Sequence, residues 1–241
     1  MGAPVLMAAE RQGDARPIME QRWRDLLFLH WAVAASDVAP LVPDGLTVDT
    51  FDGDAYLGLI FFSIPFVRHR SLPLTWGFHE TNARTYVRRA DRRGVWFFSL
   101  DAASTPAVLG ARLTYGLPYF RSTLRIRKEG DTIRYSGERR WPSPKPADYD
   151  VEAVVGADRG VAPPGSLNHF LVERYSLFAL RRGRLVSATV VHEPYRLCDA
   201  SVLRCEESLS RAAGIPAHPT PPLTTFSAGV DVRVCPATPL R

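Results

Sequence analysis

The sequence predicts an α+β fold built mainly on one curled antiparallel sheet, forming a cone or barrel around a central cavity, with few helices flanking it. Three observations support this fold class. Short runs rich in aromatic and β-branched residues recur between turn signals, as strands do. Few segments carry helix start and stop signals, and strands and helices do not alternate as a parallel sheet requires. The chain has 241 residues, 46% of them hydrophobic, which is enough for one well-packed core.

The expected strands follow the apolar runs in chain order. Residues 55–64 (AYLGLIFFSI) form the most apolar run, and 94–101 (GVWFFSLD) is apolar on both faces, which is typical of a buried central strand. The turn at 128–131 (KEGD) predicts a hairpin between the strands on either side of it. The expected strands are 26–33, 46–51, 55–64, 80–90, 94–101, 121–128, 131–140, 150–156, 176–182, 185–193 and 223–235.

Three segments carry helix signals. The first follows Ser104 and Thr105, either of which can cap it, and has Pro106 at its first position. The last has the clearest boundaries, because Asp199 can cap its start and Gly214 can end it. The expected helices are 106–115, a short helix capped by Ser166 that ends near Glu173, and 200–213.

We expect a flexible tail at residues 1–18. We expect a single domain at residues 19–241, because no repeat or low-complexity linker interrupts the chain there. The first residues lack the basic and apolar segments of a secretory signal. The three cysteines show no CxxC or paired Cys/His spacing, which favours reduced thiols. We therefore expect a cytoplasmic protein.

The chain is basic, with a formal net charge of +5 and a pI near 9.4. Of its 30 basic residues, only Lys128 and Lys145 are lysines. The arginines are spread along the chain without a stripe of five or more and without a nucleic-acid motif, so no nucleic-acid partner is expected. No apolar run is long enough to cross a membrane. The sequence leaves a homo-oligomer open.

The segment 78–87 (FHETNARTYV) is the most informative for function. Because alternate side chains of a strand share a face, Glu80, Asn82, Arg84 and Tyr86 lie together, opposite small residues that would bury little. One interpretation is a solvent-facing polar stripe on an edge strand. The other is that the polar face lines a cavity and binds a ligand there. The pattern leaves both open.

A second candidate segment is 111–119 (ARLTYGLPY), where a helix ends and a Gly-Leu-Pro turn brings Tyr119 to the start of a strand. Arg112 on the last helical turn either stabilises the helix dipole or clamps an anion bidentately. The six histidines show no metal-binding spacing, and the chain lacks GxSxG, P-loop and GxGxxG motifs. We therefore expect no metal and no cofactor.

Five segments together resemble a known family. They are FHETNARTYV, GVWFFSLDA, ARLTYGLPY, HFLVERYSLF and VVHEPYRL, in this order between about Gln21 and Cys235. They look like the YqjF-like uncharacterised family, which is grouped with the acetoacetate decarboxylase-like superfamily. The chain departs from the pattern at Tyr195 and Cys235, where a tryptophan would be expected. The resemblance implies a curved antiparallel sheet around a small-molecule cavity.

The resemblance also bears on chemistry, because the decarboxylases of this superfamily form a Schiff base on a lysine beside a second lysine. Arg112 and Pro118 match the arginine and the proline of their motif, whereas Tyr119 and Phe120 stand where the two lysines would be. Glu80 looks like the pocket glutamate of the superfamily. Schiff-base decarboxylation is therefore disfavoured.

Two functions remain open from the sequence. The first is a lyase- or hydrolase-like enzyme acting on a small keto or carboxylate metabolite by acid/base chemistry, with Glu80 and Tyr119 as catalytic residues. Its substrate-binding residues would be Arg84, Arg112, Asn82 and Tyr86. The second is a non-catalytic small-molecule binder or sensor using the same cavity. A third interpretation is structural, in which these polar groups only satisfy one another inside the sheet.

Overall fold

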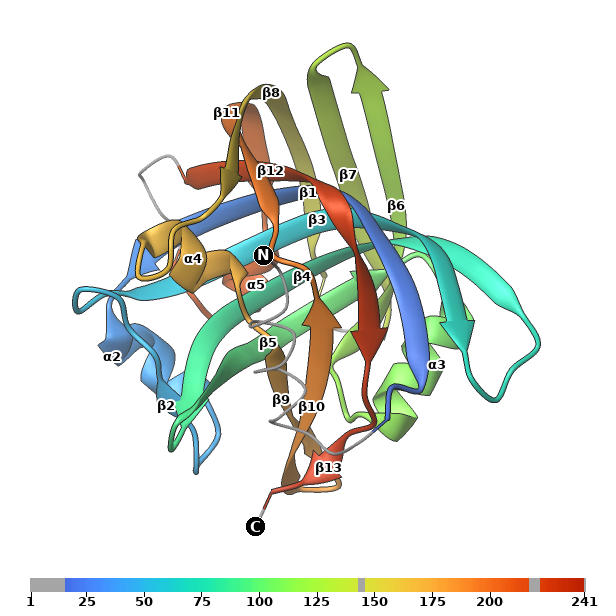
Figure 1. The fold of residues 1–241 in the computed structure, drawn as a ribbon. Coiled ribbons are helices and arrows are strands. Elements are labelled where there is room, and N and C mark those ends of the chain that lie inside the picture. Colours follow the sequence, from blue (N-terminus) through green and yellow to red (C-terminus); the bar gives the residue numbers. More distant parts are fainter. Residues whose placement is uncertain (1–15, 143–145, 217–221, 241) are drawn as a thin grey trace.

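The computed structural model describes residues 16–142, 146–216 and 222–240, so most of the expected tail at 1–18 lies outside the described residues. Long strands dominate the molecule (Figure 1). They are β1 (Met19–Val33), β2 (Thr47–Val48), β3 (Ala55–His69), β4 (Thr75–Arg89), β5 (Arg92–Ala102), β6 (Tyr119–Glu129), β7 (Thr132–Trp141), β8 (Asp148–Val161), β9 (Ser176–Arg181), β10 (Arg184–His192), β11 (Arg196–Glu207), β12 (Leu223–Val234) and β13 (Thr238–Pro239). The helices are short: α2 (Ala35–Val38), the 3-10 helix η1 (Ala39–Leu41), α3 (Thr105–Thr114), α4 (Leu167–Val172) and α5 (Leu209–Ala212).

All the described strands belong to one sheet. Its order is β13-β10-β9-β5-β6-β7-β8-β11-β12-β1-β3-β4-β2, and neighbours are antiparallel except where β5 pairs with β6 and with β9. Additional pairings of β10 with β12 and of β5 with β4 join strands that lie apart in this order, so the sheet curls back on itself. The predicted α+β class, a curled and mainly antiparallel sheet with few helices, is confirmed.

The two faces of the sheet pack two separate hydrophobic clusters, because alternate residues of each strand point to opposite faces. On β1, Leu26 and Phe28 belong to one cluster, whereas Leu27 and Leu29 belong to the other. The first cluster extends to β5, β9, β10 and the end of α4, and the second to β7, β8, α2 and α5. The cavity described below lies on the face of the first cluster.

The prediction of a helix at 200–213 is wrong over most of this range. Residues 196–207 form β11, which pairs with β8 and with β12, and Asp199 lies inside this strand rather than at a helix N-cap. Only α5 remains helical, and Gly214 follows it with a φ of +85°, as expected of a helix terminator. The local helix signals were overridden by pairing with strands distant in the sequence, which a local pattern does not report.

The remaining expected helices and strands are present, but several strands are longer than expected: β1 begins seven residues earlier, β4 begins five residues earlier, and β3 and β8 end five residues later. Of the strand expected at 46–51, only Thr47 and Val48 join the sheet. Ser104 caps α3, with its Oγ accepting a hydrogen bond from the Ala107 amide, and Pro106 occupies the first turn. Ser166 caps α4 in the same way through the His169 amide.

Removing the cap of α3 tests whether this helix contributes to stability. Ser104→Ala leaves the Ala107 amide without its partner, and we expect a loss of about 1 kcal/mol in the free energy of unfolding. Urea denaturation measures the loss, and Ser104→Asp, which retains a capping oxygen, serves as the control. Equal stability of Ser104→Ala and the unaltered protein would show that the cap does not stabilise α3.

Candidate functional site

A cavity of about 430 Å³ opens on the first cluster, between the face of β4 that carries Glu80 and residues from β1, β3, β5, α3, β9 and β10. Its walls are mainly apolar, with Phe28, Ile60, Phe62, Phe97 and Leu100 among them. Its polar lining comes from distant parts of the chain and includes Glu80, Asn82, Arg84, Tyr119, Arg174, His192 and Tyr195. A mostly apolar pocket with a few convergent polar groups is typical of a small-molecule site.

The polar stripe of β4 lies on the cavity side of the strand. Glu80, Asn82 and Arg84 line the cavity. Tyr86 shares their face but is fully buried beyond the lining residues. Its hydroxyl donates a hydrogen bond of 2.8 Å to the Leu171 carbonyl and lies 2.7 Å from His30 Nε2. The structure therefore brings three of the four β4 candidates to the cavity and places Tyr86 in its supporting layer.

Glu80 and Tyr119 form a hydrogen-bonded pair in the cavity wall. The Tyr119 hydroxyl donates to Glu80 Oε2 over 2.7 Å. Burial raises the pKa of Glu80 from 4.5 to about 7, which outweighs the opposing hydrogen bonds from Tyr119 and Asn82. Burial also raises the pKa of Tyr119 well above its ordinary value, and the nearby Glu80 raises it further. Glu80 can therefore exchange a proton near neutral pH, while Tyr119 remains protonated as a donor.

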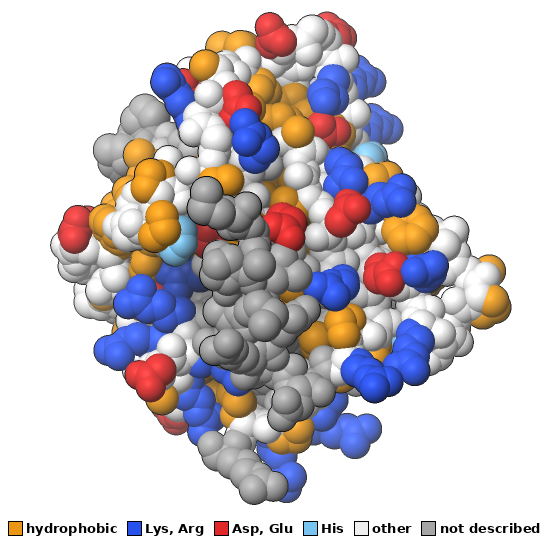
Figure 2. All heavy atoms as spheres, in the orientation of Figure 1, with side chains coloured by type: hydrophobic (Ala, Val, Ile, Leu, Met, Phe, Trp, Pro, Cys, Tyr) orange, Lys and Arg blue, Asp and Glu red, His pale blue; other side chains and the backbone are white. Residues whose placement is uncertain are grey.

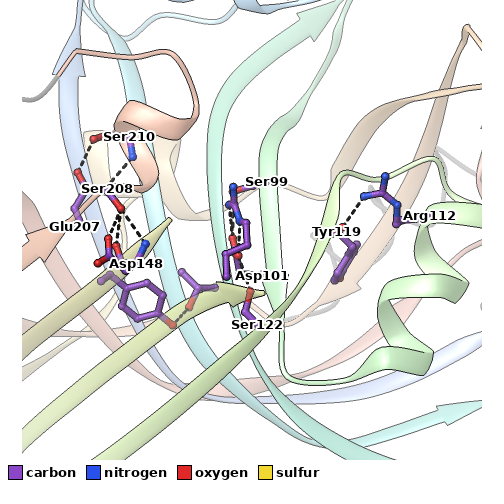
Figure 3. Close-up of polar contacts among 12 residues, drawn as sticks. Ser99, Asp101, Arg112, Tyr119, Ser122, Asp148, Glu207, Ser208 and Ser210 are labelled. Carbon is purple, nitrogen blue, oxygen red and sulfur yellow. Dashed lines mark hydrogen bonds and ion pairs between the residues drawn. The ribbon is translucent and has the colours of Figure 1, made fainter. Parts of the chain in front are cut away.

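The turn between α3 and β6 fixes the position of Tyr119. Gly116 has a φ of +72°, and a Cβ there would lie 2.4 Å from the Leu180 carbonyl oxygen, so this turn requires glycine. Arg112 Nη1 donates to the Tyr119 carbonyl over 2.7 Å, as Figure 3 shows for the side chain that extends from α3. The Arg112 guanidinium also packs over Trp141 and is not among the cavity-lining residues. The structure thus places Arg112 behind the turn, where it holds backbone and not a ligand.

Arg84 brings an uncompensated positive charge to the cavity. Its Nη2 donates to the Leu171 carbonyl over 3.1 Å, and its guanidinium lies 5.6 Å from the centre of the Tyr86 ring. Within the part of the chain that the structure describes, no carboxylate forms an ion pair with it. A half-buried cation without an acidic partner favours an anionic ligand.

Arg174 is a cavity residue that the sequence reasoning missed. It follows α4, its Nη1 donates to Asp49 Oδ2 over 2.7 Å, and its guanidinium packs over the Phe170 ring. Burial lowers the pKa of Arg174, although its bond to Asp49 opposes this. The adjacent charges of Glu173 and Arg174 inside the otherwise apolar run HFLVERYSLF were the signal that could have found it.

A cluster around His192 forms another part of the wall and was also missed. The His192 ring lies 4.7 Å from the Tyr175 ring and 4.6 Å from the Tyr195 ring, between centres. Its Nδ1 is hydrogen-bonded to the Glu193 carbonyl, which leaves Nε2 as the acceptor of a neutral ring. Burial lowers the pKa of His192 to about 4, so the ring adds no charge to the cavity near neutral pH.

The cavity wall contains unsatisfied hydrogen-bonding atoms. In the described part of the chain, five buried side-chain atoms lack a partner, and four of them belong to cavity-lining residues. Three are donors and one is an acceptor. A buried donor or acceptor without a hydrogen-bond partner destabilises the folded protein by about 1–3 kcal/mol, and a ligand that supplies the partner removes this penalty. These atoms are Trp76 Nε1, Asn82 Oδ1, Arg84 Nε and Arg174 Nη2.

A buried ion pair supports the strands behind Glu80. Asp101 accepts hydrogen bonds from Arg139 Nε and Nη2, both at 2.8 Å, and from the Ser122 hydroxyl at 2.7 Å. Figure 3 shows Asp101 between Ser99 and Ser122, away from Tyr119. Its register partner is Thr81, whose side chain points to the face opposite Glu80. The negative charge of Asp101 adds to the raised pKa of Glu80.

The lysines lie elsewhere. Lys128 is half-exposed and forms an ion pair of 2.7 Å with Asp25, outside the cavity, and Lys145 lies outside the described residues.

The face shown in Figure 2 intersperses Lys and Arg with acidic side chains and does not gather them in one patch. Among the described residues, no helix is long and apolar enough to cross a membrane, and no three His, Cys, Asp or Glu side chains are arranged to hold a metal ion.

Comparison with known proteins gives both family and structural matches. The family model DUF2071, described as an uncharacterized conserved protein, matches residues 20–231. The uncharacterized protein YqjF of Bacillus subtilis (strain 168) is 36% identical over 224 residues, which cover 89% of each chain.

The solved structures that match share the fold at low sequence identity. An acetoacetate decarboxylase-like enzyme from Sphingomonas wittichii RW1 has a TM-score of 0.64 at 13% identity over 94% of each chain. Acetoacetate decarboxylase from Legionella pneumophila has a TM-score of 0.62 at 13% identity, over 94% of this chain and 88% of that one. The enduracididine biosynthesis enzyme MppR, solved with pyruvate, has a TM-score of 0.62 at 12% identity, over 95% and 93%. These similarities establish the fold alone.

Proposed function

This chain belongs to the DUF2071 family of uncharacterized conserved proteins, which here has an acetoacetate decarboxylase-like fold, and on that premise we propose that it is an enzyme. Its substrate is a small keto acid, and its chemistry is proton transfer without a Schiff base. The observation that carries the proposal is the Glu80–Tyr119 pair, which combines a carboxyl of pKa about 7 with a phenol donor in an apolar cavity.

The proposed step is proton abstraction from the carbon next to the substrate carbonyl. The Glu80 carboxylate takes the proton, so that the C–H bond breaks, an O–H bond forms on Glu80, and the electron pair moves to the carbonyl oxygen. The Tyr119 hydroxyl, which bonds Glu80 in the structure, turns to the developing oxyanion and donates a hydrogen bond to it. Reprotonation by Glu80 completes the cycle. Arg84 holds the carboxylate of the substrate, since its charge has no acidic partner among the described residues.

A thermal-shift and exchange experiment tests the proposal. The protein is screened against pyruvate, levulinate and 6-oxoheptanoate in D₂O, and NMR follows deuterium entering the position next to the ketone. We expect at least one acid to raise the melting temperature and to exchange faster with the protein than without it. Stabilisation without exchange would contradict the enzyme and support the alternative of a non-catalytic binder or sensor.

Borohydride trapping tests the absence of a Schiff base. We expect the intact mass of the protein to remain unchanged after reduction in the presence of each keto acid. A Schiff base needs an amine in the cavity, but the side chain hydrogen-bonded to Glu80 is the phenol of Tyr119, and the amine of Lys128 is bound to Asp25 outside the cavity. Mass spectrometry measures the result. A covalent adduct at Lys128 or Lys145 would overturn this part of the mechanism.

A further inference from the structure

The cavity has two chemically different ends on the same strand. Glu80 and Arg84 are four residues apart on β4, which separates their Cα atoms by about 13 Å at about 3.3 Å per residue. Tyr119 approaches Glu80 from β6. The Arg84 guanidinium leans the other way, toward Tyr86 and the Leu171 carbonyl. The positive charge and the acid/base pair therefore lie at opposite ends of the polar stripe.

Arg174 stands at the same end as Arg84. The guanidinium carbons of both arginines lie close to the ring of Tyr86, at 5.6 Å for Arg84 and 5.0 Å for Arg174. Both arginines line the cavity, and both contain a buried nitrogen without a hydrogen-bond partner. Asp49 pairs with Arg174 and also, at 3.7 Å, with the exposed Arg93, which does not line the cavity, whereas no described acidic residue pairs with Arg84. The two cavity-lining arginines therefore hold at least one unpaired positive charge. That charge matches a single carboxylate.

Apolar side chains form the walls between the two ends. The register places Ile60 of β3 and Leu100 of β5 on either side of Asn82, which is the midpoint of the stripe. Both line the cavity, and Asn82 is the polar group of β4 between them. A cavity volume of about 430 Å³ falls in the range of sites that hold ligands considerably larger than pyruvate.

From this arrangement we infer that the ligand is a monocarboxylate whose carbonyl is separated from the carboxylate by an apolar segment of several carbons. Arg84 and Arg174 bind the carboxylate, and the carbonyl end reaches Glu80 and Tyr119. A keto acid as short as pyruvate occupies one end or the other but not both. The inference rests on the proposed function and assigns its substrate class.

The test measures the affinity of the full chain for pyruvate, levulinate, 6-oxoheptanoate and the methyl ester of 6-oxoheptanoate by titration calorimetry. We expect 6-oxoheptanoate to bind at least about 10-fold more tightly than pyruvate and than its own ester, since the ester lacks the charge that Arg84 recognises. Equal affinity for pyruvate and 6-oxoheptanoate, equal affinity for acid and ester, or no binding of any probe would overturn the inference.

Variants assign the recognition to Arg84. We expect Arg84→Gln to remove the preference for acid over ester. The control Arg159→Gln, which changes an exposed arginine paired with Asp199, should retain it. A preference that survives in Arg84→Gln would place the carboxylate elsewhere. The acid–ester comparison on the unaltered protein decides the ligand class even when Arg84→Gln does not fold.

Exchange measurements separate this inference from the proposed function. Tight binding of 6-oxoheptanoate without deuterium exchange would support the two-ended site and contradict the enzyme. Exchange of pyruvate and 6-oxoheptanoate at equal affinity would support the enzyme and contradict the two-ended site.

Discussion

Replacing Glu80 with glutamine is expected to lower the catalysed rate of deuterium exchange by at least about 100-fold, the smaller part of the range for loss of a general base. Glutamine has nearly the same shape and still accepts the hydrogen bond from Tyr119, but it takes up no proton. Binding of the keto acid should persist, because the carboxylate is held by Arg84 and not by Glu80. NMR exchange rates and calorimetric affinities on the same preparation measure both effects.

The same variant should change stability with pH. The pKa of Glu80 is about 7 in the folded protein against an ordinary 4.5, so the folded state retains a proton that the unfolded state releases. This stabilisation is complete below about pH 4.5 and is lost as the pH rises through about 7, which lowers the free energy of unfolding by about 3 kcal/mol. Glu80→Gln does not incur this loss. Relative to the unaltered protein, the variant should therefore become more stable by about 3 kcal/mol between pH 4.5 and 8.

Urea denaturation at several pH values measures this difference, with Glu20→Gln as the control. Glu20 is half-exposed and pairs with Arg68 at the surface, so its replacement should leave the exchange rate unchanged and the pH dependence nearly so. A difference between Glu80→Gln and the unaltered protein that stays constant with pH would show that Glu80 does not titrate near neutrality in the folded state.

The second large effect concerns the buried pair behind the site. Arg139→Met leaves the Asp101 carboxylate buried without its cation, since both side chains are almost fully buried, and we expect a loss of about 3–5 kcal/mol in the free energy of unfolding. Adding Asp101→Asn to Arg139→Met removes the unpaired charge and should restore much of this loss.

An exposed ion pair supplies the matched comparison. Arg68→Met breaks the pair with Glu20, in which both side chains are at least half-exposed, and should cost at most about 1 kcal/mol. Urea denaturation of the three variants at one pH gives the values. If Arg139→Met costs no more than Arg68→Met, the Asp101–Arg139 pair does not stabilise the strands behind Glu80.

The alternation of residues along β4 was readable from the sequence. A strand has a period of two whatever its environment, so Glu80, Asn82 and Arg84 had to share one face once the strand was recognised. Residues of β4 on the other face, such as Ala83, pack in the second hydrophobic cluster. The local spacing could not say whether the polar face met solvent or a cavity, since β1, β9 and β10 complete the cavity from distant parts of the chain.

Other features depended on contacts that local patterns do not contain. Arg112 matched an anion clamp by its position near Tyr119, but the turn directs its guanidinium to the Tyr119 carbonyl. Arg174 reaches the cavity because it follows α4 directly, and its guanidinium packs over the rings of Tyr86 on β4 and Phe170 on α4. The segment 200–213 carried good helix boundaries, yet it supplies a strand that the sheet needs between β8 and β12.

The pH dependence of deuterium exchange into 6-oxoheptanoate tests the central claim most directly. If Glu80 is the base, the catalysed rate should rise with pH, reach half its maximum at about pH 7, and level off above it. The raised pKa of Tyr119 keeps the donor protonated over this range. The rise should be absent in Glu80→Gln. A rate that does not titrate near pH 7, or a Glu80→Gln variant that retains it, would contradict the account.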